Sequence, residues 1–329
     1  MRKLKIGFFI SINITAIYLL GPHPEKPYFD NALPYISNQI TVDDYVSEME
    51  SNFKIKENNE AKIIWAESSY QVTEYAIVYL HGFSASQMEG DPVHRNIAKQ
   101  FNCNLYLARL AEHGLTGSDA MQNLTAENLW VSAKEAFAIG KKLGKKVILI
   151  GTSTGGTLAL QLAAHFPEIA GLILYSPNIE INNPSAPLLN NPWGLQIARL
   201  IQGSKFNNVS YKNKDYPKYW NPHYRLEATV ALENLLEATM NEQLFKKITQ
   251  PCLTLYYYKD EAHQDKVVKV AATQRMFAQL STPDNLKRMK AMPKTENHVL
   301  ASPLVSKDVE GVEKETAKFI AEKIIKVTL

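Results

Sequence analysis

The chain has 329 residues, of which 45% are hydrophobic and 21% are charged, a balance typical of a globular protein with a sizeable core. A formal net charge of +3 argues against a nucleic-acid partner, because the lysines occur singly on helix-like segments rather than in one patch. One α/β domain with an insertion accounts for this length. No zinc-type Cys/His spacing and no glycine-rich phosphate loop occurs, so no metal or cofactor is predicted.

The first 21 residues differ from the rest. A basic lead with Arg2, Lys3 and Lys5 precedes an almost uncharged apolar run over residues 6–20, which Gly21-Pro22 ends. The run fits a signal-peptide core and is short for a membrane-spanning helix. Because no clear small-x-small cleavage pattern follows, an uncleaved anchor and a buried helix remain as alternatives. We predict that residues 1–21 are a signal peptide or N-terminal membrane anchor, and that the protein is exported, periplasmic or membrane-anchored.

Residues 22–60 are predicted to be an N-terminal arm and a short helix. Residues 22–41 are rich in Pro, Asn and Tyr, which is typical of an extended linker. A helix is expected to begin near Thr41 and to end near residue 53, with Thr41 or Asp43 as its N-cap.

Strand-like and helix-like segments alternate from residue 61 onwards. The predicted strands are 61–66, 76–80, 104–109, 146–150, 170–175, 252–258 and 286–292. The predicted helices are 93–101, 127–143, 157–165, 269–280 and 309–325. Apolar strands separated by helices predict a mostly parallel sheet covered on both faces, built from residues 61–176 and 251–329.

Both cysteines, Cys103 and Cys252, fall at predicted strands of this core. In the usual strand order of such a sheet the two strands are not neighbours. The thiols are therefore expected to be too far apart to form a disulfide and to be buried separately.

The strand over residues 146–150 ends in Gly-x-Ser-x-Gly at residues 151–155, and a helix-like segment follows at once. Strand, sharp turn and helix together form the context of a nucleophile elbow, in which the serine backbone is strained. Gly151 and Gly155 leave room for that turn. Ser153 is therefore predicted to be a catalytic nucleophile rather than a helix N-cap serine.

A serine nucleophile that attacks a carbonyl needs donors for the oxyanion. One is predicted to be the backbone N–H of Thr154, directly after the serine. The other is predicted to be the N–H of Phe83, in the His81-Gly82-Phe83 turn that follows the strand over residues 76–80. His81 is expected to brace this turn through a hydrogen bond rather than to act as a base.

Residues 177–250 interrupt the alternation, since about seventy residues stand where one helix would suffice. We predict that they form a cap inserted between two late strands, with helices at 195–202 and 226–244, above the active site. Most of its aromatic side chains are expected to pack between cap and core, and one or two to line an acyl pocket. These aromatic residues are Tyr211, Tyr216, Tyr219, Trp220 and Tyr224.

The strand over residues 252–258 is followed by two candidates for the acid that orients a catalytic histidine. Asp260 lies at the usual distance from the strand. Asp265 opens an Asp-Lys-Val-Val segment whose apolar pair can anchor it against the core. We favour Asp265, with residues 261–264 as a loop elaboration, and keep Asp260 as the alternative.

Of the eight histidines, His298 fits the catalytic base best. It lies in a loop after the last predicted strand and before the final helix. His165 and His223 fall in helix-like or inserted segments and are expected to be surface or packing residues.

Taken in order, these motifs resemble those of the α/β-hydrolase superfamily, of the monoacylglycerol lipase and carboxylesterase kind. The matching segments are His81-Gly82-Phe83, Arg109-Leu110, His113-Gly114, the Gly-x-Ser-x-Gly at 151–155, Asp265-Lys266-Val267-Val268 and Asn297-His298-Val299. The resemblance implies an α/β-hydrolase fold and a triad in the order Ser153, Asp265, His298. The extra residues between Asp260 and Asp265 depart from the usual pattern of the family.

The expected function is hydrolysis of a carboxylic ester, with a small-molecule ester as substrate. The aromatic cap favours medium-length or aromatic acyl groups over long-chain triglycerides. A peptidase, a thioesterase, an acyltransferase or a non-catalytic binding protein of the same fold are the alternatives. Membrane association through the N-terminus is a further hypothesis, and the sequence does not determine an oligomeric state.

Overall fold

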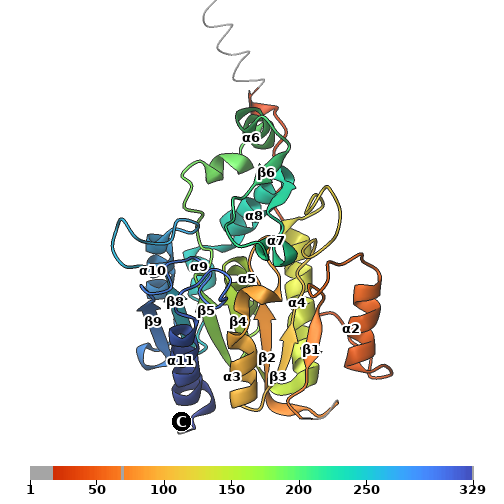
Figure 1. The fold of residues 1–329 in the computed structure, drawn as a ribbon, viewed down its shortest axis with the longest axis vertical. Coiled ribbons are helices and arrows are strands. Elements are labelled where there is room, and N and C mark those ends of the chain that lie inside the picture. The colour runs from red at the N-terminus through yellow and green to blue at the C-terminus, as the bar shows by residue number, and fades with distance from the viewer. Residues whose placement is uncertain (1–17, 68–69, 328–329) are drawn as a thin grey trace, which may run out of the picture.

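A computed structural model describes residues 18–67 and 70–327 of the chain. Its centre is a seven-stranded sheet in the order β1-β3-β2-β4-β5-β8-β9, in which β1 is antiparallel to β3 and the other pairs are parallel (Figure 1). The strands are β1 Lys62–Ile64, β2 Thr73–Leu80, β3 Asn104–Leu107, β4 Gly144–Thr152, β5 Gly171–Tyr175, β8 Cys252–Tyr256 and β9 Lys287–Ala291. The prediction of a mostly parallel α/β sheet is confirmed.

Helices cover both faces of this sheet. One face is covered by α3 Val93–Gln100 and α11 Val309–Phe319 (Figure 1). The other face is covered by α4 Ala126–Leu143, α5 Thr154–His165 and α10 Val270–Gln279. Alternate side chains of the strands enter two separate apolar clusters. On β2, for example, Val78 packs with α4 and Tyr79 packs with α3. Burial on both faces explains why inner strands such as β5 and β8 are largely apolar.

Several predicted boundaries differ from those observed. The short helix is α2 Val42–Ser51, and Thr41 is its N-cap, since its Oγ1 accepts the Asp44 N–H at 3.1 Å. The last predicted helix changes type after α11, where a π-helical stretch η4 covers Ile320–Ile325. The structure also contains two short helical turns, η1 Gln87–Gly90 and η3 Asp284–Leu286, that the sequence pattern did not reveal.

Residues 177–250, called the cap below, lie between β5 and β8 and stand above the sheet in Figure 1. They contain η2 Ala186–Asn190, α6 Gly194–Gln202, β6 Phe206–Asn208, α7 Tyr216–Tyr219, β7 His223–Arg225, α8 Leu226–Thr239 and α9 Glu242–Phe245. The single helix predicted over residues 226–244 is wrong. Helix α8 ends at Thr239, and a new helix, α9, begins after Asn241, whose side chain accepts the Leu244 N–H at 3.1 Å as an N-cap.

Backbone hydrogen bonds fasten the cap to the core loops beneath it. The Asn178 N–H donates to the Ser153 carbonyl at 3.0 Å, at the root of the cap. Further along, the Asn221 N–H donates to the Ser84 carbonyl at 2.7 Å. The cap is thus joined directly to the two segments that carry the predicted nucleophile and the predicted oxyanion donor.

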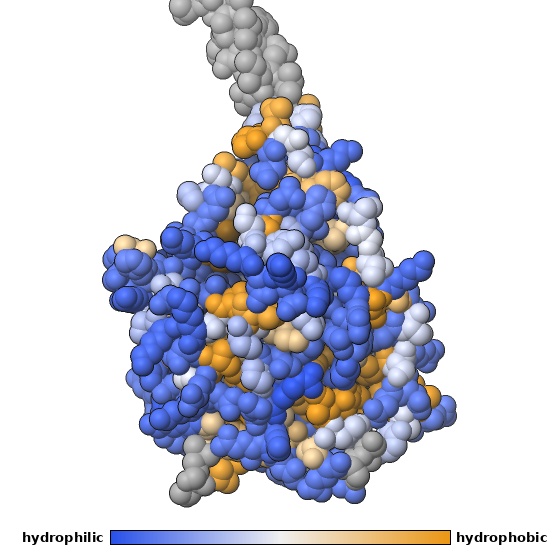
Figure 2. All heavy atoms as spheres, viewed as in Figure 1, coloured by the Kyte–Doolittle hydropathy of each residue, from blue (hydrophilic) through white to orange (hydrophobic). Residues whose placement is uncertain are grey.

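Helix α6 lies at the narrow end of the molecule, where the first described residues also emerge (Figure 1). The Trp193 N–H donates to the Pro22 carbonyl at 2.8 Å. Apolar surface is visible at this end, and Leu20, Leu200 and Ile201 are each more than 80% exposed (Figure 2).

The predicted signal peptide or anchor, residues 1–21, lies mostly outside the described residues. Within residues 18–67 and 70–327, no helix combines the length and the apolar character that a bilayer crossing requires. Cys103 and Cys252 are free, buried thiols, as their separated strands led us to expect.

Candidate active site

Ser153 lies at the junction of β4 and α5 in a strained backbone conformation, with φ 52° and ψ −116°. The neighbouring glycines are needed because backbones approach closely there. A Cβ added at Gly155 would lie 1.9 Å from the Leu80 carbonyl oxygen, and one at Gly151 would lie 2.5 Å from the Gly155 carbonyl oxygen. The local structure is therefore the strand–turn–helix expected for a nucleophile elbow.

Asp265 and His298 meet although 33 positions separate them in the sequence. His298 Nδ1 lies 2.6 Å from Asp265 Oδ2, and the other carboxylate oxygen accepts the N–H groups of Val267 and Val268 at 2.8 and 3.1 Å. This contact places the proton of a neutral His298 on Nδ1 and leaves Nε2 free to accept one. Asp265 is almost fully buried.

Asp260 is placed elsewhere. Its Oδ1 contacts His263 Nδ1 at 2.8 Å, and both side chains are largely exposed. Residues 261–264 form a loop that the Tyr258–Gln264 bridge closes. The catalytic roles remain predictions, but Asp265, not Asp260, is the carboxylate in contact with His298.

His298 has two carboxylates near it. Burial alone would lower the pKa of its imidazole, but Asp265 and Glu89 outweigh burial and raise that pKa above its ordinary value of 6.5. Ser153 and His298 line one cavity, yet the hydrogen bonds of the described residues include none between them. Such contacts commonly shorten only when substrate is bound.

Two backbone N–H groups beside Ser153 have no partner within the described part of the chain, those of Phe83 and Thr154. The turn that carries Phe83 lies against the nucleophile, because a Cβ added at Gly82 would lie 3.0 Å from Ser153 Cβ. Both N–H groups are therefore available to an oxyanion, the role predicted for them.

His81 braces this turn, as expected. Its Nε2 accepts the Leu110 N–H at 3.1 Å, so Nδ1 carries the proton and donates to the Gly82 carbonyl at 2.9 Å. Burial lowers the pKa of His81 well below 6.5, which keeps the ring neutral and this pattern intact.

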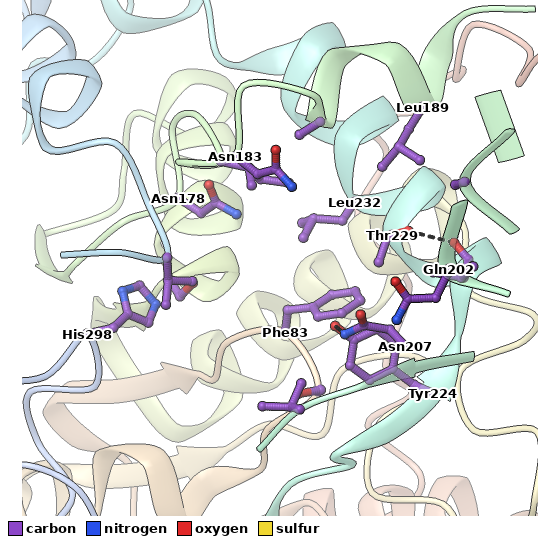
Figure 3. Close-up of a pocket in the computed structure, with 18 of the residues that line it drawn as sticks. Phe83, Asn178, Asn183, Leu189, Gln202, Asn207, Tyr224, Thr229, Leu232 and His298 are labelled. Carbon is purple, nitrogen blue, oxygen red and sulfur yellow. Dashed lines mark hydrogen bonds between the residues drawn. The ribbon is translucent and has the colours of Figure 1, made fainter. Parts of the chain in front are cut away.

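A cavity of about 1010 Å³ opens above Ser153 between core and cap. Figure 3 shows His298 at one end and Leu189 and Gln202 at the other, with Phe83 and Tyr224 between them. The two rings meet edge to face, 5.2 Å apart. Most of the wall comes from the cap and is apolar.

More of the cap aromatics line this cavity than expected. Tyr211, Tyr216, Trp220 and Tyr224 all contribute to its wall, and Tyr219 does not. The physical reason is stacking: Tyr216 lies between Tyr211 and Trp220, with ring centroids 5.7 and 4.6 Å away, so the rings form one continuous face.

Glu89 belongs to the site and was missed by the sequence analysis. It is 2% exposed, lines the cavity, and accepts the Gly82 N–H on Oε2 at 2.5 Å. The available signal was Ser-x-x-Glu over residues 86–89, a helix-start pattern. Ser86 does cap η1, but the Glu89 side chain reaches back beyond it to Gly82.

Metal binding has no candidate in the described ranges, where no group of three or more His, Cys, Asp or Glu side chains is placed to hold an ion.

Comparison with known proteins gives one family and many similar folds. Residues 129–300, just over half of the chain, match the family model described as serine aminopeptidase, S33. A thermostable monoacylglycerol lipase from Bacillus sp. (strain H-257) is 28% identical over 144 residues, which are 43% of this chain and 56% of that lipase. The chain thus spans little more than half the length of this relative.

Three solved structures show the similarity of fold. A structure from work on the metagenome-derived lipolytic enzymes LipS and LipT has a TM-score of 0.65 at 17% identity, covering 82% of this chain and all of that one. A monoacylglycerol lipase from Paleococcus ferrophilus gives 0.55 at 15% identity, over 80% of this chain and 98% of its own. Est1E from Butyrivibrio proteoclasticus, bound to ferulic acid, gives 0.55 at 17% identity, over 81% and 95%.

Proposed function

The chain belongs to the serine aminopeptidase S33 family of α/β-hydrolases, and from that premise we propose that it hydrolyses carboxylic esters, with Ser153 as nucleophile. The observation that carries this proposal is the Asp265–His298 contact at the cavity that Ser153 also lines. A base held in one tautomer, at the same cavity as a strained serine, is the arrangement that supports acyl transfer.

The reaction proceeds in two halves. His298 Nε2 takes the Ser153 hydroxyl proton as Oγ bonds to the ester carbonyl carbon, and the N–H groups of Phe83 and Thr154 hold the oxyanion. His298 then gives its proton to the departing alkoxide as the bond between the carbonyl carbon and the alkoxide oxygen breaks. The acyl group remains on Ser153 as an acyl-serine. In the second half water is deprotonated by His298, attacks the acyl carbon and releases the acid, and Ser153 regains its proton.

The substrate is a small ester with a medium-length or aromatic acyl group. The stacked Tyr211, Tyr216 and Trp220 and the aliphatic side chains of the cap give the cavity an apolar wall. Such a wall suits an acyl chain or an aromatic ring and offers few partners to a highly charged substrate. The name of the Bacillus relative, a monoacylglycerol lipase, agrees with this choice.

The test uses a fluorophosphonate probe and a panel of p-nitrophenyl esters of increasing acyl length. Wild-type protein should be labelled and should turn over the esters, whereas Ser153→Ala should lose labelling and Ser153→Ala and His298→Ala should each lose turnover by at least about 1000-fold. Ser176→Ala is the matched control: it is also a buried serine at positive φ, but it does not line the cavity. A folded wild type that is neither labelled nor active would contradict the proposal.

An aminopeptidase is the second candidate, for a specific reason besides the family description. An aminopeptidase needs an acidic group to receive the α-ammonium of its substrate, and Glu89 is the one acidic side chain among the described residues that line the cavity. Aminoacyl p-nitroanilides assayed beside the esters decide between the two. The peptidase would be favoured if the wild type turns over the anilides and Glu89→Gln raises the KM for them.

We further propose that the protein is exported, with residues 1–21 as a signal peptide or an N-terminal membrane anchor. The basic lead and the apolar run support this. Expression of the whole chain and of residues 22–329, followed by fractionation and alkaline extraction of membranes, tests it. Equal recovery of both forms from the cytoplasm would contradict it.

A further inference from the structure

Glu89 is a buried acid that the proposed reaction does not use. Its carboxylate has one hydrogen bond among the described residues, from the Gly82 N–H to Oε2. Burial raises the pKa of this carboxyl to about 7. A buried acid with so few partners is costly to keep, so its position beside the predicted nucleophile calls for a role.

Hydrogen bonds hold Gly82 from both sides. Its N–H is bound by Glu89, and its carbonyl accepts the His81 Nδ1 proton at 2.9 Å and the Ala85 N–H at 3.3 Å. The Gly82 carbonyl and the Phe83 N–H belong to one planar trans peptide unit and point in opposite directions. Fixing Gly82 therefore fixes the direction of the Phe83 N–H.

Gly82 also separates the carboxylate from the nucleophile. A Cβ added there would lie 2.9 Å from both Glu89 oxygens and 3.0 Å from Ser153 Cβ, so no side chain fits between them. A glycine is the most flexible residue in a chain, and it holds a catalytic direction only if other groups restrain it. His81 restrains the carbonyl side of Gly82, and Glu89 is the side chain that restrains the N–H side.

Resting on the proposed function, we propose that Glu89 is a positioning residue of the oxyanion hole. Its side-chain oxygen holds the Gly82 N–H and so directs the Phe83 N–H to the carbonyl oxygen of an ester bound at Ser153. The contribution comes from hydrogen-bond acceptance and reach, and not from charge. The transition state gains from it more than the bound ester does, because the donor is aimed at the oxyanion.

Three variants of the full chain separate acceptance, charge and reach. Glu89→Gln keeps an acceptor at the same length without the charge, Glu89→Asp keeps the charge with one methylene less, and Glu89→Ala removes both. Steady-state kinetics on p-nitrophenyl butyrate should show kcat lowered about 100-fold in Glu89→Ala and Glu89→Asp with KM within about threefold, and kcat within about fivefold of wild type in Glu89→Gln. Glu233→Ala, which removes another buried glutamate far along the chain in α8, should leave kcat unchanged.

The outcomes are distinct from those of the proposed function. An inactive wild type contradicts ester hydrolysis itself. An active wild type with Glu89→Ala within twofold of it overturns the role of Glu89, as does a raised KM with unchanged kcat. Loss of activity in Glu89→Gln with retention in Glu89→Asp would assign the role to charge and overturn the proposal equally. Should Glu89→Ala fail to fold by circular dichroism, the Gln and Asp pair still decides.

Discussion

At the scale of single residues, the two carboxylates that face His298 differ in what holds them. Asp265 accepts hydrogen bonds from two backbone N–H groups and from the imidazole, whereas within the described part of the chain Glu89 accepts one only from the Gly82 N–H. Asp265 is thus fixed before any substrate arrives, which suits a residue that orients the base.

Asp265→Asn is therefore expected to lower kcat by roughly 10³–10⁴-fold, because an amide can hold the ring in the wrong tautomer. Asp260→Asn should stay within about twofold of wild type, since Asp260 contacts His263 on the surface. Kinetics on p-nitrophenyl butyrate compare the two. If Asp260→Asn is the variant that loses activity, the acid has been assigned wrongly.

The pH dependence of turnover follows from the groups around His298. The reaction needs the neutral imidazole, and the nearby carboxylates raise the pKa of His298 above 6.5, so kcat/KM should rise with pH along a limb centred above 6.5. Glu89 titrates in the same range and broadens that limb.

Removing the charge in Glu89→Gln should move the rise of kcat/KM to lower pH, because only Asp265 then stabilises the imidazolium. The rise should also become steeper and follow the titration of a single group, His298. The measurement is kcat/KM from pH 5 to 9 in both proteins. A limb that stays in place would mean that Glu89 does not affect the base.

The sequence indicates some of these residues better than others. Ser153 stands in a motif whose geometry is local, and His298 follows the last strand, so both are predictable from position along the chain. The Asp265–His298 contact depends on how far the loop after β8 extends, which spacing left open between two candidates. Glu89 lies in a segment without strand or helix periodicity, and its partner is set by the tertiary path of the chain.

At the scale of elements, α2 is held to the core through a buried ion pair. Arg109 donates to both Glu50 carboxylate oxygens at 2.9 and 3.1 Å through Nε, and both side chains are at most 10% exposed. Arg109 also covers the Phe53 ring, 4.5 Å from its centroid. The pair thus links α2 to the loop after β3.

Glu50→Ala is expected to lower the free energy of unfolding by about 3 kcal/mol, because it leaves the Arg109 guanidinium buried without its partner. Urea unfolding followed by circular dichroism measures the change. Glu74→Ala, which breaks an exposed pair with Lys145 and Lys146, is the control and should leave the midpoint where it is. Equal urea midpoints in the wild type, Glu50→Ala and Glu74→Ala would show that the buried ion pair adds nothing to the stability of the fold.

The elements of the cap were harder to predict than those of the core. An excess of about seventy residues suffices to predict an insertion, but not its internal boundaries. The break between α8 and α9 depends on one side-chain cap at Asn241, and the antiparallel β6–β7 pair joins two strands of three residues each. Strands that short carry no detectable alternation.

At the scale of the whole molecule, buried acids make stability depend on pH. The pKa of Glu89 is raised from 4.5 to about 7, so between these values the folded protein holds a proton that the unfolded chain has lost. Stability therefore falls as pH rises through this window, by up to about 3 kcal/mol from this one group.

Glu89→Gln should remove this fall in stability with rising pH, because glutamine does not titrate. The difference in unfolding free energy, variant minus wild type, should grow as pH rises from about 4.5 to about 7 and be constant above it. Urea titrations at pH 5 and pH 8 give the difference, in which buried histidines that Glu89 does not affect, such as His81 and His113, cancel. A difference that is the same at both pH values would mean that Glu89 is ionised throughout.

The alternation of strands and helices gave the layer architecture, because burial of a parallel sheet on both faces leaves a strong apolar signal. It did not give the antiparallel direction of β1, which is a short edge strand with half-exposed side chains.

Most of the cavity wall belongs to one uninterrupted stretch of sequence, whereas Ser153, Asp265 and His298 lie outside it. Under the proposed function, the residues that carry out the reaction and most of those that select the substrate thus lie in separate segments of the sequence. Under that function, exchanging residues 177–250 for the equivalent insertion of a related chain is expected to change the preferred acyl group while Ser153, Asp265 and His298 are kept.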